Sequence, residues 1–460
     1  MSAISNAGNR TDVPAATVPG RDAIENLRQG IEGQVLVPED EKFVAASSGW
    51  SVLTQHRPYV VVMAKSTTDI VRAVQFARDH ELPVGVLTTG HGTPVACTDG
   101  VLINTSQLRG VDIDPEQRTA RVDAGAQWKD VVPLAHQHGL APLSGSGSNI
   151  GVVGYSLGGG SGWMVRKYGR ASERIRAAEV VTANGELLQV TPTSHGDLLD
   201  ALKGGGGNFG VVTSLEFELL PVTEVYGGFA VYPLATASDV FRAFRDWTAT
   251  LPEDITTSIS IMRFPDLPAF PPMLRGAATV IVRAGATGDL AAGEQVIAPM
   301  RAIGTPILDT FHRMPITETD AIGGDPVDPL PVISRTLMME NLTDDLIDDL
   351  LSVVGAGIES PITLVQIRHF DEGFAGQAVG IAPSPGAAAG LEVALAGWTS
   401  ALQPYATGRV TLNFLGDGDV GEERTRAAYT PERFAQLQAV KAKYDPNNMF
   451  RFNHNIRPGD

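Results

Sequence analysis

The stretch GSGSNIGVVGYSLGGGSGW, residues 145–163, decides how the rest of this chain is interpreted. Eight of the eighteen residues from 145 to 162 are glycine, where the average glycine content of the chain would give about two. Backbone amides without side chains in the way can approach a diphosphate or a flat polar ring closely. A flexible linker is the alternative, but a solvated linker would not carry the apolar residues that lie between these glycines, namely Ile150, Val152, Val153, Tyr155, Leu157 and Trp163. The stretch therefore favours a cofactor-binding segment.

Composition and charge narrow the class of protein. The 460 residues suffice for two or three domains with a large core, and 43% hydrophobic with 19% charged residues is typical of a globular chain. A formal net charge of −17 argues against nucleic acid or an anionic membrane as partner, because both would repel the chain. The single cysteine, Cys97, excludes an internal disulfide and a multi-thiolate metal site.

The N-terminal residues lack the basic start and apolar core of a signal peptide, and no apolar run is long enough to span a bilayer. We expect residues 1–22 to form a disordered tail on a cytoplasmic enzyme, monomeric or homodimeric, with no membrane partner.

Residues 59–92 carry the first structural signals. Apolar runs at 59–64 and 83–87 predict buried strands, and apolar residues at 3–4 spacing between them predict a helix capped by Thr67 or Thr68. This strand–helix–strand order favours parallel strands. The second strand leads into His91, flanked by glycines, at a point where α/β folds place ligand chemistry. A lone histidine is more often structural, but beside the glycine stretch His91 is the best candidate nucleophile or cofactor contact.

The remaining elements follow from periodicity and turn residues. We expect strands at 101–104, 120–124 and 211–219, helices at 128–139 and 198–203, and a hairpin of 178–183 with 187–190 around Asn184-Gly185. Proline-rich loops at 264–273 and 326–331 show that the character of the sequence changes in the second half of the chain. There we expect helices at 238–251, 290–303, 343–355 and 391–406 and strands at 278–283, 362–368 and 410–414. A last helix begins after the cap Thr430 and runs to Lys443.

Six pieces in this order resemble a known family: LPVGVLTTGHG, LINTSQL, VDAGAQW, SNIGVVGYSLGGGSGW, EVVTANGELLQV and ALKGGGGNFGVVTSLEFEL. They closely resemble the FAD-binding domain of the vanillyl-alcohol oxidase / p-cresol methylhydroxylase (PCMH) superfamily, in its berberine-bridge-enzyme-like branch. The resemblance covers about residues 30–222 and the C-terminal YDPNNMFRFNHNIRP. Neither the stretch at 145–163 nor the second glycine cluster, GGGGNFG at 204–210, follows a strand and opens a helix as a Rossmann fingerprint would.

The resemblance implies an α+β fold. It would comprise a two-subdomain, PCMH-type FAD-binding domain at 23–222 and a substrate-binding domain at 223–416, an antiparallel sheet covered by helices. The C-terminal segment 417–460 would return to the FAD domain.

The same resemblance implies covalent FAD, held by an 8α-histidyl bond from His91. A neutral imidazole is a good nucleophile, and its second nitrogen can orient it. Gly147 stands where some relatives have a cysteine, so we expect one covalent bond at most. A β-branched residue at Ile150 goes with oxygen access in relatives and favours an oxidase. The further cofactor contacts implied are Thr88, Thr89, Gly90, Gly92, Ser148, Ile150, Gly151, Gly154, Gly158, Gly210, Val212, Asn453 and Asn455.

The strand TLVQIRHF carries the substrate-side candidates. Its alternation puts Gln366 and Arg368 on one face, which either looks at the flavin and contacts substrate or lies in water. Relatives often have a tyrosine at the position of Thr411, so the residue that accepts the substrate proton stays open. Gln366, Arg368 and Tyr155 are the catalytic candidates; His369, Asp371 and Glu372 are weaker ones.

These observations predict an FAD-dependent oxidase. It would take a hydride from a C–H bond beside an alcohol, amine or activated carbon of a small molecule, such as a secondary metabolite or a sugar, with molecular oxygen as acceptor. The alternatives are a flavin dehydrogenase or monooxygenase of a biosynthetic pathway, and a flavin-binding protein without redox turnover.

Overall fold

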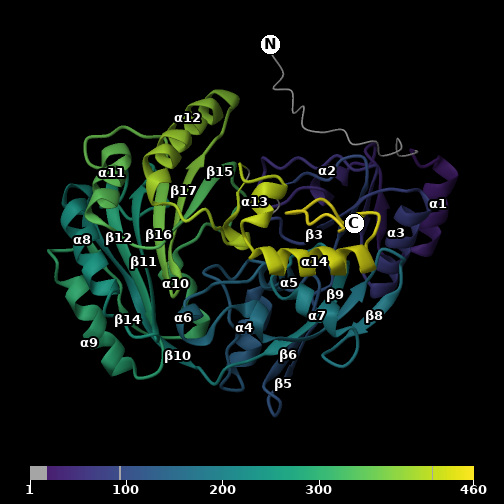
Figure 1. The fold of residues 1–460 in the computed structure, drawn as a ribbon, viewed down its shortest axis with the longest axis horizontal. Helices are drawn as coiled ribbons and strands as arrows, with labels where there is room; N and C mark the ends of the chain where they lie inside the picture. Colours follow the sequence, from purple (N-terminus) through teal and green to yellow (C-terminus); the bar gives the residue numbers. More distant parts are fainter. Residues whose placement is uncertain (1–17, 93–94, 417, 460) are drawn as a thin grey trace.

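The computed structural model describes residues 18–92, 95–416 and 418–459. They form three sheets surrounded by helices (Figure 1), so the predicted α+β class is confirmed. Most of the predicted tail lies outside the described residues, and helix α1 (Arg21–Gly30) begins two residues before the predicted domain start. The other domain borders stay predictions.

The first sheet has the order β1-β2-β4-β3. Strands β2 and β3 both run parallel to β4, which lies between them, so the predicted parallel arrangement is confirmed with one strand inserted. The cap of α3 is Ser66, whose hydroxyl accepts a hydrogen bond from the Asp69 amide, and not Thr67 or Thr68. The elements are β1 (Gln34–Leu36), β2 (Val60–Met63), β3 (Val84–Leu87), β4 (Val101–Asn104), α2 (Phe43–Ala46) and α3 (Thr67–Asp79).

The second sheet is antiparallel, in the order β5-β6-β9-β7-β8. Strand β5 was not predicted, because its sequence VDID has only two apolar residues and is half-exposed. The predicted hairpin at Asn184-Gly185 is confirmed, but its loop is longer than two residues, since the ladder ends at Val181 and Leu187. The elements are β5 (Val111–Asp114), β6 (Thr119–Asp123), β7 (Ile175–Val181), β8 (Leu187–Val190), β9 (Val211–Glu218), α4 (Trp128–His136), α5 (Val152–Leu157), α6 (Val165–Tyr168) and α7 (Gly196–Leu202).

The third sheet has eight strands, all paired antiparallel, in the order β13-β10-β12-β11-β16-β17-β15 with β14 beside β10. The strands are β10 (Glu224–Pro233), β11 (Ile255–Arg263), β12 (Ala278–Ala286), β13 (Leu308–Asp309), β14 (His312–Pro315), β15 (Val332–Met339), β16 (Leu364–Phe370) and β17 (Gly373–Ile381). The strand predicted at 410–414 is wrong: the Phe414 amide donates to the Thr411 carbonyl, which closes a 3₁₀ turn at Leu412–Phe414.

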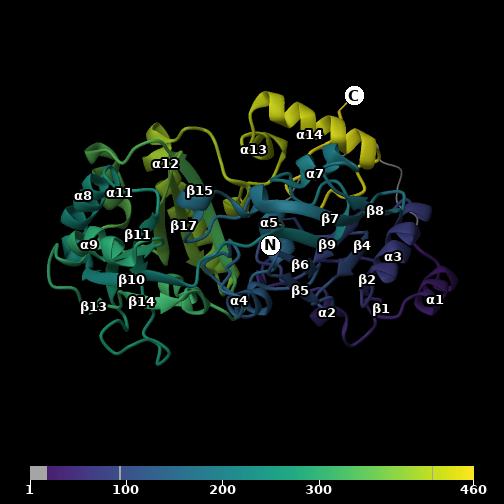
Figure 2. The same cartoon turned by 90° about the horizontal axis from the view of Figure 1, so that it is seen from below.

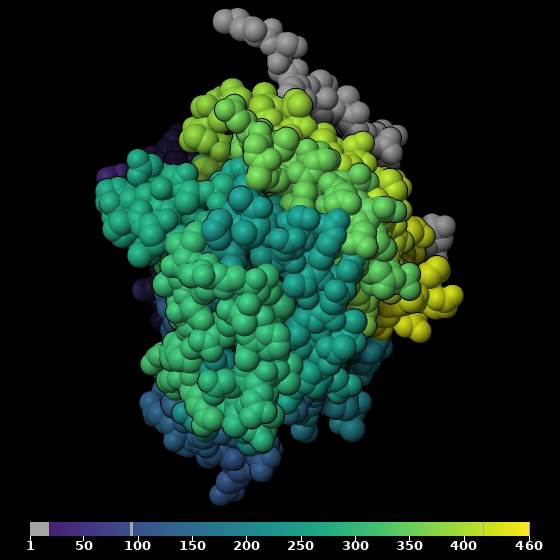
Figure 3. All heavy atoms as spheres, turned by 90° about the vertical axis from the view of Figure 1, so that its left-hand side faces the viewer, coloured from purple at the N-terminus to yellow at the C-terminus, as the bar shows by residue number. Residues whose placement is uncertain are grey.

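Helices cover one face of this sheet, as the view from below shows (Figure 2). They are α8 (Ala237–Thr248), α9 (Leu290–Arg301), α11 (Asp344–Val354) and α12 (Pro385–Leu402). The short helix α10 (Asp320–Gly323) is not part of this layer. Phe241, Leu346 and Trp398 pack with Val365 and Ile367 in one apolar core. This helical layer forms the end of the molecule seen in Figure 3, and the opposite face of the sheet turns toward the first two sheets.

The C-terminal residues return to the first half of the chain, as the resemblance implies. Helices α13 (Glu422–Arg426) and α14 (Pro431–Tyr444) lie beside α5 and α7 (Figure 1), and the Thr430 hydroxyl caps α14 as predicted. Lys441 is fully buried and donates to the Asp445 carboxylate at 2.6 Å and to the Asn208 and Phe450 carbonyls. Among the described residues, no helix combines the length and apolar character needed to cross a bilayer.

The buried pair predicts a large effect on stability. Lys441→Met leaves the Asp445 carboxylate buried without its cation, which we expect to lower the free energy of unfolding by about 3–5 kcal/mol, measured by urea denaturation. Lys443→Met is the matched control, because Lys443 and its partner Asp197 are largely exposed and contribute little. Equal losses in the two variants would contradict this account of the C-terminal docking.

Candidate active site

The loop that carries His91 is held by close backbone contacts after β3. Gly90 has φ +73°, and a Cβ there would lie 2.5 Å from the Cα of Gly49, so only glycine fits. The Trp50 amide donates to the Thr89 carbonyl at 2.8 Å. The Thr88 hydroxyl bonds to the Thr105 hydroxyl at 2.7 Å. The backbone before His91 is therefore fixed, while Gly92 after it is exposed.

The imidazole of His91 lies in a defined environment. Its ring stacks on Trp50, with centroids 4.8 Å apart and 15° between planes, and its Nε2 lies 3.4 Å from the Asn149 amide nitrogen. Its Nδ1 is buried without a hydrogen-bond partner. Burial lowers the pKa of His91 to about 4, with a smaller opposing effect from Asp325. The ring is therefore neutral at physiological pH, with one nitrogen unpaired.

A loop from the second half of the chain reaches both neighbours of His91. We call residues 324–331 the bridging loop. Its Val327 carbonyl accepts hydrogen bonds from the Trp50 indole at 3.1 Å and from the Asn149 side chain at 3.2 Å. Its Asp325 carboxylate accepts one from the Ser146 hydroxyl. The loop thus joins the eight-stranded sheet to the segments around His91.

The glycine stretch surrounds helix α5. Gly151 is its N-cap residue, and a Cβ there would lie 3.3 Å from the Thr88 side chain. A Cβ at Gly158 would lie 2.8 Å from the Asn413 side chain, whereas at Gly154, which is exposed, nothing lies within 4 Å. Close packing explains why residues 151 and 158 are glycine. The open space beside Gly154 leaves room for a ligand. Just before this helix, the Ser148 amide donates to Asp320 at 3.2 Å, and the half-buried Ile150 packs against the core of the second sheet.

Two of the predicted cofactor contacts lie in strand β9 or directly before it. Gly210 has φ +159°, and a Cβ there would lie 2.5 Å from Val180 on the neighbouring strand β7. The Val212 side chain belongs to the apolar core. Strand packing accounts for both residue types, and their contact with the cofactor stays a prediction.

The C-terminal motif lies against the second glycine cluster. The Asn453 side chain donates to the Gly207 carbonyl at 3.0 Å, and Asn208 bonds to the His454 carbonyl and the Ile456 amide. The Oδ1 atoms of Asn453 and Asn455 and the Nδ1 of His454 are buried without partners. Burial also lowers the pKa of His454 to about 4. Neither His454 nor Asn208 is predicted from the sequence as a site residue.

These unpaired atoms test whether the chain fits the predicted cofactor. A buried polar atom without a hydrogen bond is costly, and native chains leave few of them. His91, Asn453, His454 and Asn455 each contribute such an atom, all from segments of the FAD-like motifs. FAD carries ring carbonyls, an N–H group and hydroxyls that can pair with them. The residues present therefore fit FAD.

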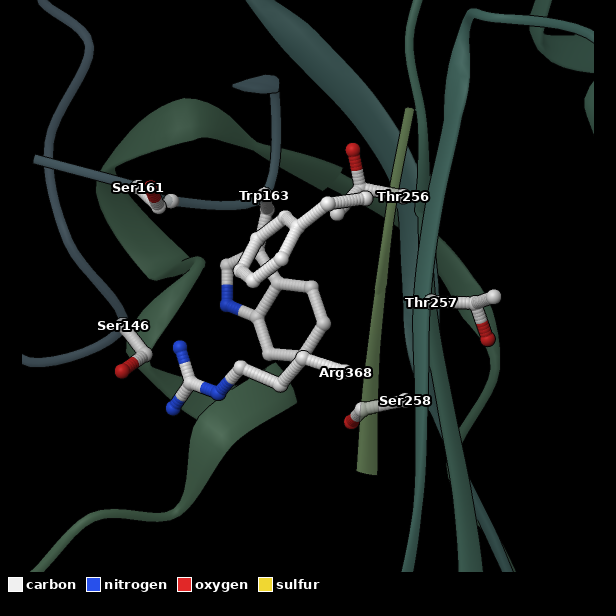
Figure 4. A pocket seen from close by; sticks show the side chains of 9 residues that line it. Ser146, Ser161, Trp163, Thr256, Thr257, Ser258 and Arg368 are labelled. Atoms are coloured by element: carbon white, nitrogen blue, oxygen red, sulfur yellow. The ribbon is translucent and has the colours of Figure 1, made fainter. Parts of the chain in front are cut away.

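The polar face of β16 turns inward and not to water. Val365 and Ile367 lie under the helices, while Gln366 is buried on the opposite face and accepts a hydrogen bond from Arg368 Nε at 2.7 Å. A small cavity of about 10 Å³ lies beside Arg368 (Figure 4). Its lining combines both halves of the chain: Ser146, Ser161, Gly162, Trp163, Thr256, Thr257, Ser258, Arg368 and Phe370.

Tyr155 lies edge-on to Trp128, with centroids 5.4 Å apart. Its hydroxyl is buried without a partner, and burial raises its pKa beyond the usual range, so the group stays protonated. It can donate a proton or a hydrogen bond, but it is a poor base. Asn413 fixes the same helix, because its side chain donates to the Tyr155 carbonyl and accepts from the Gly160 amide.

The weaker candidates are engaged elsewhere. Asp371 and Glu372 pair with Arg166 and Arg170, and His369 stacks on Phe374 with a pKa lowered to about 4 by burial.

Several residues near the site were not predicted. Arg283 on β12 is buried and donates to Ser260 at 2.7 Å, and burial lowers its pKa to about 10. Trp50, Asn149 and Asp325 act on His91 from positions far apart in sequence. Of these residues only Arg283 carries a sequence signal of its role, because it is an isolated arginine in an otherwise apolar strand.

Two family models match the chain, an FAD-binding domain at residues 58–191 and a berberine and berberine-like domain at 412–457. The chain is 26% identical over 457 residues to an FAD-linked oxidoreductase of Dictyostelium discoideum, covering 95% of this chain and 97% of the relative. It is 27% identical to the (R)-6-hydroxynicotine oxidase of Paenarthrobacter nicotinovorans, covering 93% and 97%.

Among solved structures, 6-hydroxy-D-nicotine oxidase from Arthrobacter nicotinovorans has the same fold, with a TM-score of 0.84, 24% identity and coverage of 93% and 98%. Matches at both ends of the chain, together with the fold, agree with the glycine stretch, the His91 loop and the C-terminal asparagines. The chain is an FAD-linked oxidoreductase, and these matches agree with its resemblance to the berberine-bridge-enzyme-like branch of the vanillyl-alcohol oxidase / p-cresol methylhydroxylase superfamily.

Proposed function

We propose that this protein is an FAD-dependent oxidase of a small-molecule substrate and that His91 attaches the flavin covalently. The observation that carries the proposal is the state of the His91 ring. It is neutral, it is oriented by Trp50 and Asn149, and its buried Nδ1 has no other partner. A nucleophile needs a free electron pair in a fixed direction, and Nδ1 offers one in the neutral tautomer that carries its proton on Nε2.

The roles of the other residues follow from their places. Bound FAD would accept a hydride from a substrate C–H bond and deliver the electrons to oxygen. Asn453 and Asn455 present unpaired oxygens from the C-terminal segment that would hold the cofactor. Gln366 and Arg368 would orient the substrate from the sheet, and Tyr155 would donate a hydrogen bond. None of these three is a ready base, so the group that accepts a proton from the substrate is left unassigned.

The first prediction concerns attachment. His91→Ala should abolish flavin that stays with the protein after acid precipitation, measured by absorbance of the redissolved pellet. His56→Asn is a control in the same half of the chain, because the His56 Nδ1 is already used by the Cys97 amide at 2.9 Å. Acid-stable flavin in His91→Ala would show that another residue forms the bond. Flavin released from the wild type by acid would refute the covalent claim.

The second prediction concerns pH. Since the pKa of His91 is lowered from 6.5 to about 4, the imidazole stays unprotonated well below neutral pH. Incorporation of acid-stable flavin into apoprotein should be constant from pH 8 to about 5 and should fall only toward pH 4. Asn149→Asp puts a carboxylate beside Nε2 and should shift the fall to higher pH. Half-maximal incorporation near pH 6.5 in the wild type would mean an exposed imidazole instead.

The third prediction separates an oxidase from a dehydrogenase. Anaerobically reduced protein, mixed with oxygen in a stopped-flow instrument, should reoxidise at least as fast as it turns over. Ile150→Leu moves the branch point away from Cβ and should slow reoxidation by about tenfold, roughly 1.4 kcal/mol in the barrier. Ile150→Val keeps the β-branch and should react like the wild type. Reoxidation slower than turnover in the wild type favours a dehydrogenase, and a flavin–oxygen adduct in the trace favours a monooxygenase.

A further inference from the structure

A buried arginine, Arg283, and a half-buried one, Arg368, lie on the inward face of the large sheet. In the strand register, Ser258 of β11 pairs with Arg283 of β12 on one side and with Arg368 of β16 on the other. All three therefore share one rung, and their side chains project from the same face. Strand β11 with its small Ser258 lies between them, so the Cα atoms of the two arginines are two strand spacings, roughly 10 Å, apart.

Neither guanidinium is neutralised by the described residues. Arg283 donates to the Ser260 hydroxyl, and Arg368 donates to the Gln366 side chain at 2.7 Å and lies 5.1 Å from the Phe414 ring. No ion pair of either arginine with a described carboxylate is present. The Nε of Arg283, a residue with 9% exposure, is buried without any partner. An uncompensated buried charge is strongly unfavourable, which points to an anion that the polypeptide does not supply.

Unused hydrogen-bond donors gather at the adjoining cavity. The Ser161 hydroxyl and the Trp163 indole nitrogen line this cavity together with Arg368, and both are buried without partners. The exposed fractions of Ser161 and Trp163 are only 4% and 8%. Figure 4 shows the Arg368 side chain extending across the pocket toward Ser146. An indole N–H can only donate, so the matching group must be an acceptor.

The balance of charge around the two arginines indicates a single negative charge. Asp325 is the carboxylate whose field acts on Arg283 and Arg368 alike, and it is itself exposed and bonded to Ser146. Solvent screens an exposed charge. The nearby His91 ring adds no charge, so two cations face one screened carboxylate. A monoanion would complete the site.

We propose that Arg283 and Arg368 bind a carboxylate of the substrate, with Ser161 and Trp163 as further donors, and so select acids over neutral analogues. The proposal rests on the proposed oxidase function, which it narrows to substrates that carry a carboxylate near the oxidised carbon. Guanidinium forks match carboxylate geometry, and charge-assisted hydrogen bonds of this kind are strong.

The test is a titration of the flavin-loaded protein with benzoate, and with its neutral isostere benzamide, at constant ionic strength. We expect benzoate to bind and to raise the melting temperature, and benzamide to bind at least about tenfold more weakly. Arg283→Gln and Arg368→Gln should each weaken benzoate binding by about ten- to hundredfold, because each removes charged donors. Arg245→Gln is the control, since Arg245 pairs with Asp246 and Asp344 on the outer helical layer.

Three results would overturn the proposal: equal binding of benzoate and benzamide by the wild type, benzoate binding no tighter than chloride, or unchanged benzoate binding in both folded arginine variants. The wild-type comparison decides the matter even if neither variant folds. Flavin content and anaerobic bleaching are measured on the same samples. Protein that holds and reduces its flavin but ignores benzoate refutes the carboxylate site alone, whereas protein without flavin refutes the proposed function.

Discussion

The desolvated imidazole of His91 is the feature on which the proposed chemistry depends. Burial keeps it neutral, Trp50 fixes the plane of its ring, and Asn149 approaches one nitrogen while the other stays unpaired. Each of these contacts comes from a different part of the chain, and the carbonyl of Val327 ties Trp50 and Asn149 together. A histidine on a flexible glycine-flanked loop would have neither a defined direction nor a lowered pKa. The tertiary structure therefore gives this side chain the neutral and oriented state that the proposed attachment requires.

The second half of the chain contributes the opposite side of the site. Its sheet is apolar on the face under the helices and polar on the face toward the segments proposed to hold the cofactor. Along β16 and β11, side chains that pack in the apolar core therefore alternate with side chains that can contact a ligand. The bridging loop joins this sheet to the His91 region, and the buried Lys441 pair holds the C-terminal asparagines against the second glycine cluster. The segments proposed to hold the cofactor and the sheet face proposed to meet the substrate are thus positioned by contacts between distant parts of the chain.

Local sequence signals predicted much of this arrangement and left out what depends on distant contacts. The α+β class, the parallel strands 60–63 and 84–87 of the first sheet, the 178–190 hairpin and the capped helix after Thr430 follow from periodicity, turn residues and capping. The sequence does not predict strand β5, because VDID has little apolar character. The apolar residues at 410–414 predict a strand wrongly, because apolar character alone does not distinguish a strand from a half-buried 3₁₀ turn. The roles of Trp50, Asp325 and Arg283 could not be predicted, because burial of a charge and stacking of rings arise only when segments hundreds of residues apart meet.

The most direct measurement of the central claim is peptide mass spectrometry of the purified protein after proteolysis. The account predicts a flavin-sized mass increase on the peptide that contains His91, with fragment ions that place the flavin on the imidazole and on no other residue. A peptide of unmodified mass from a yellow, active preparation, or a flavin located on another side chain, would contradict it.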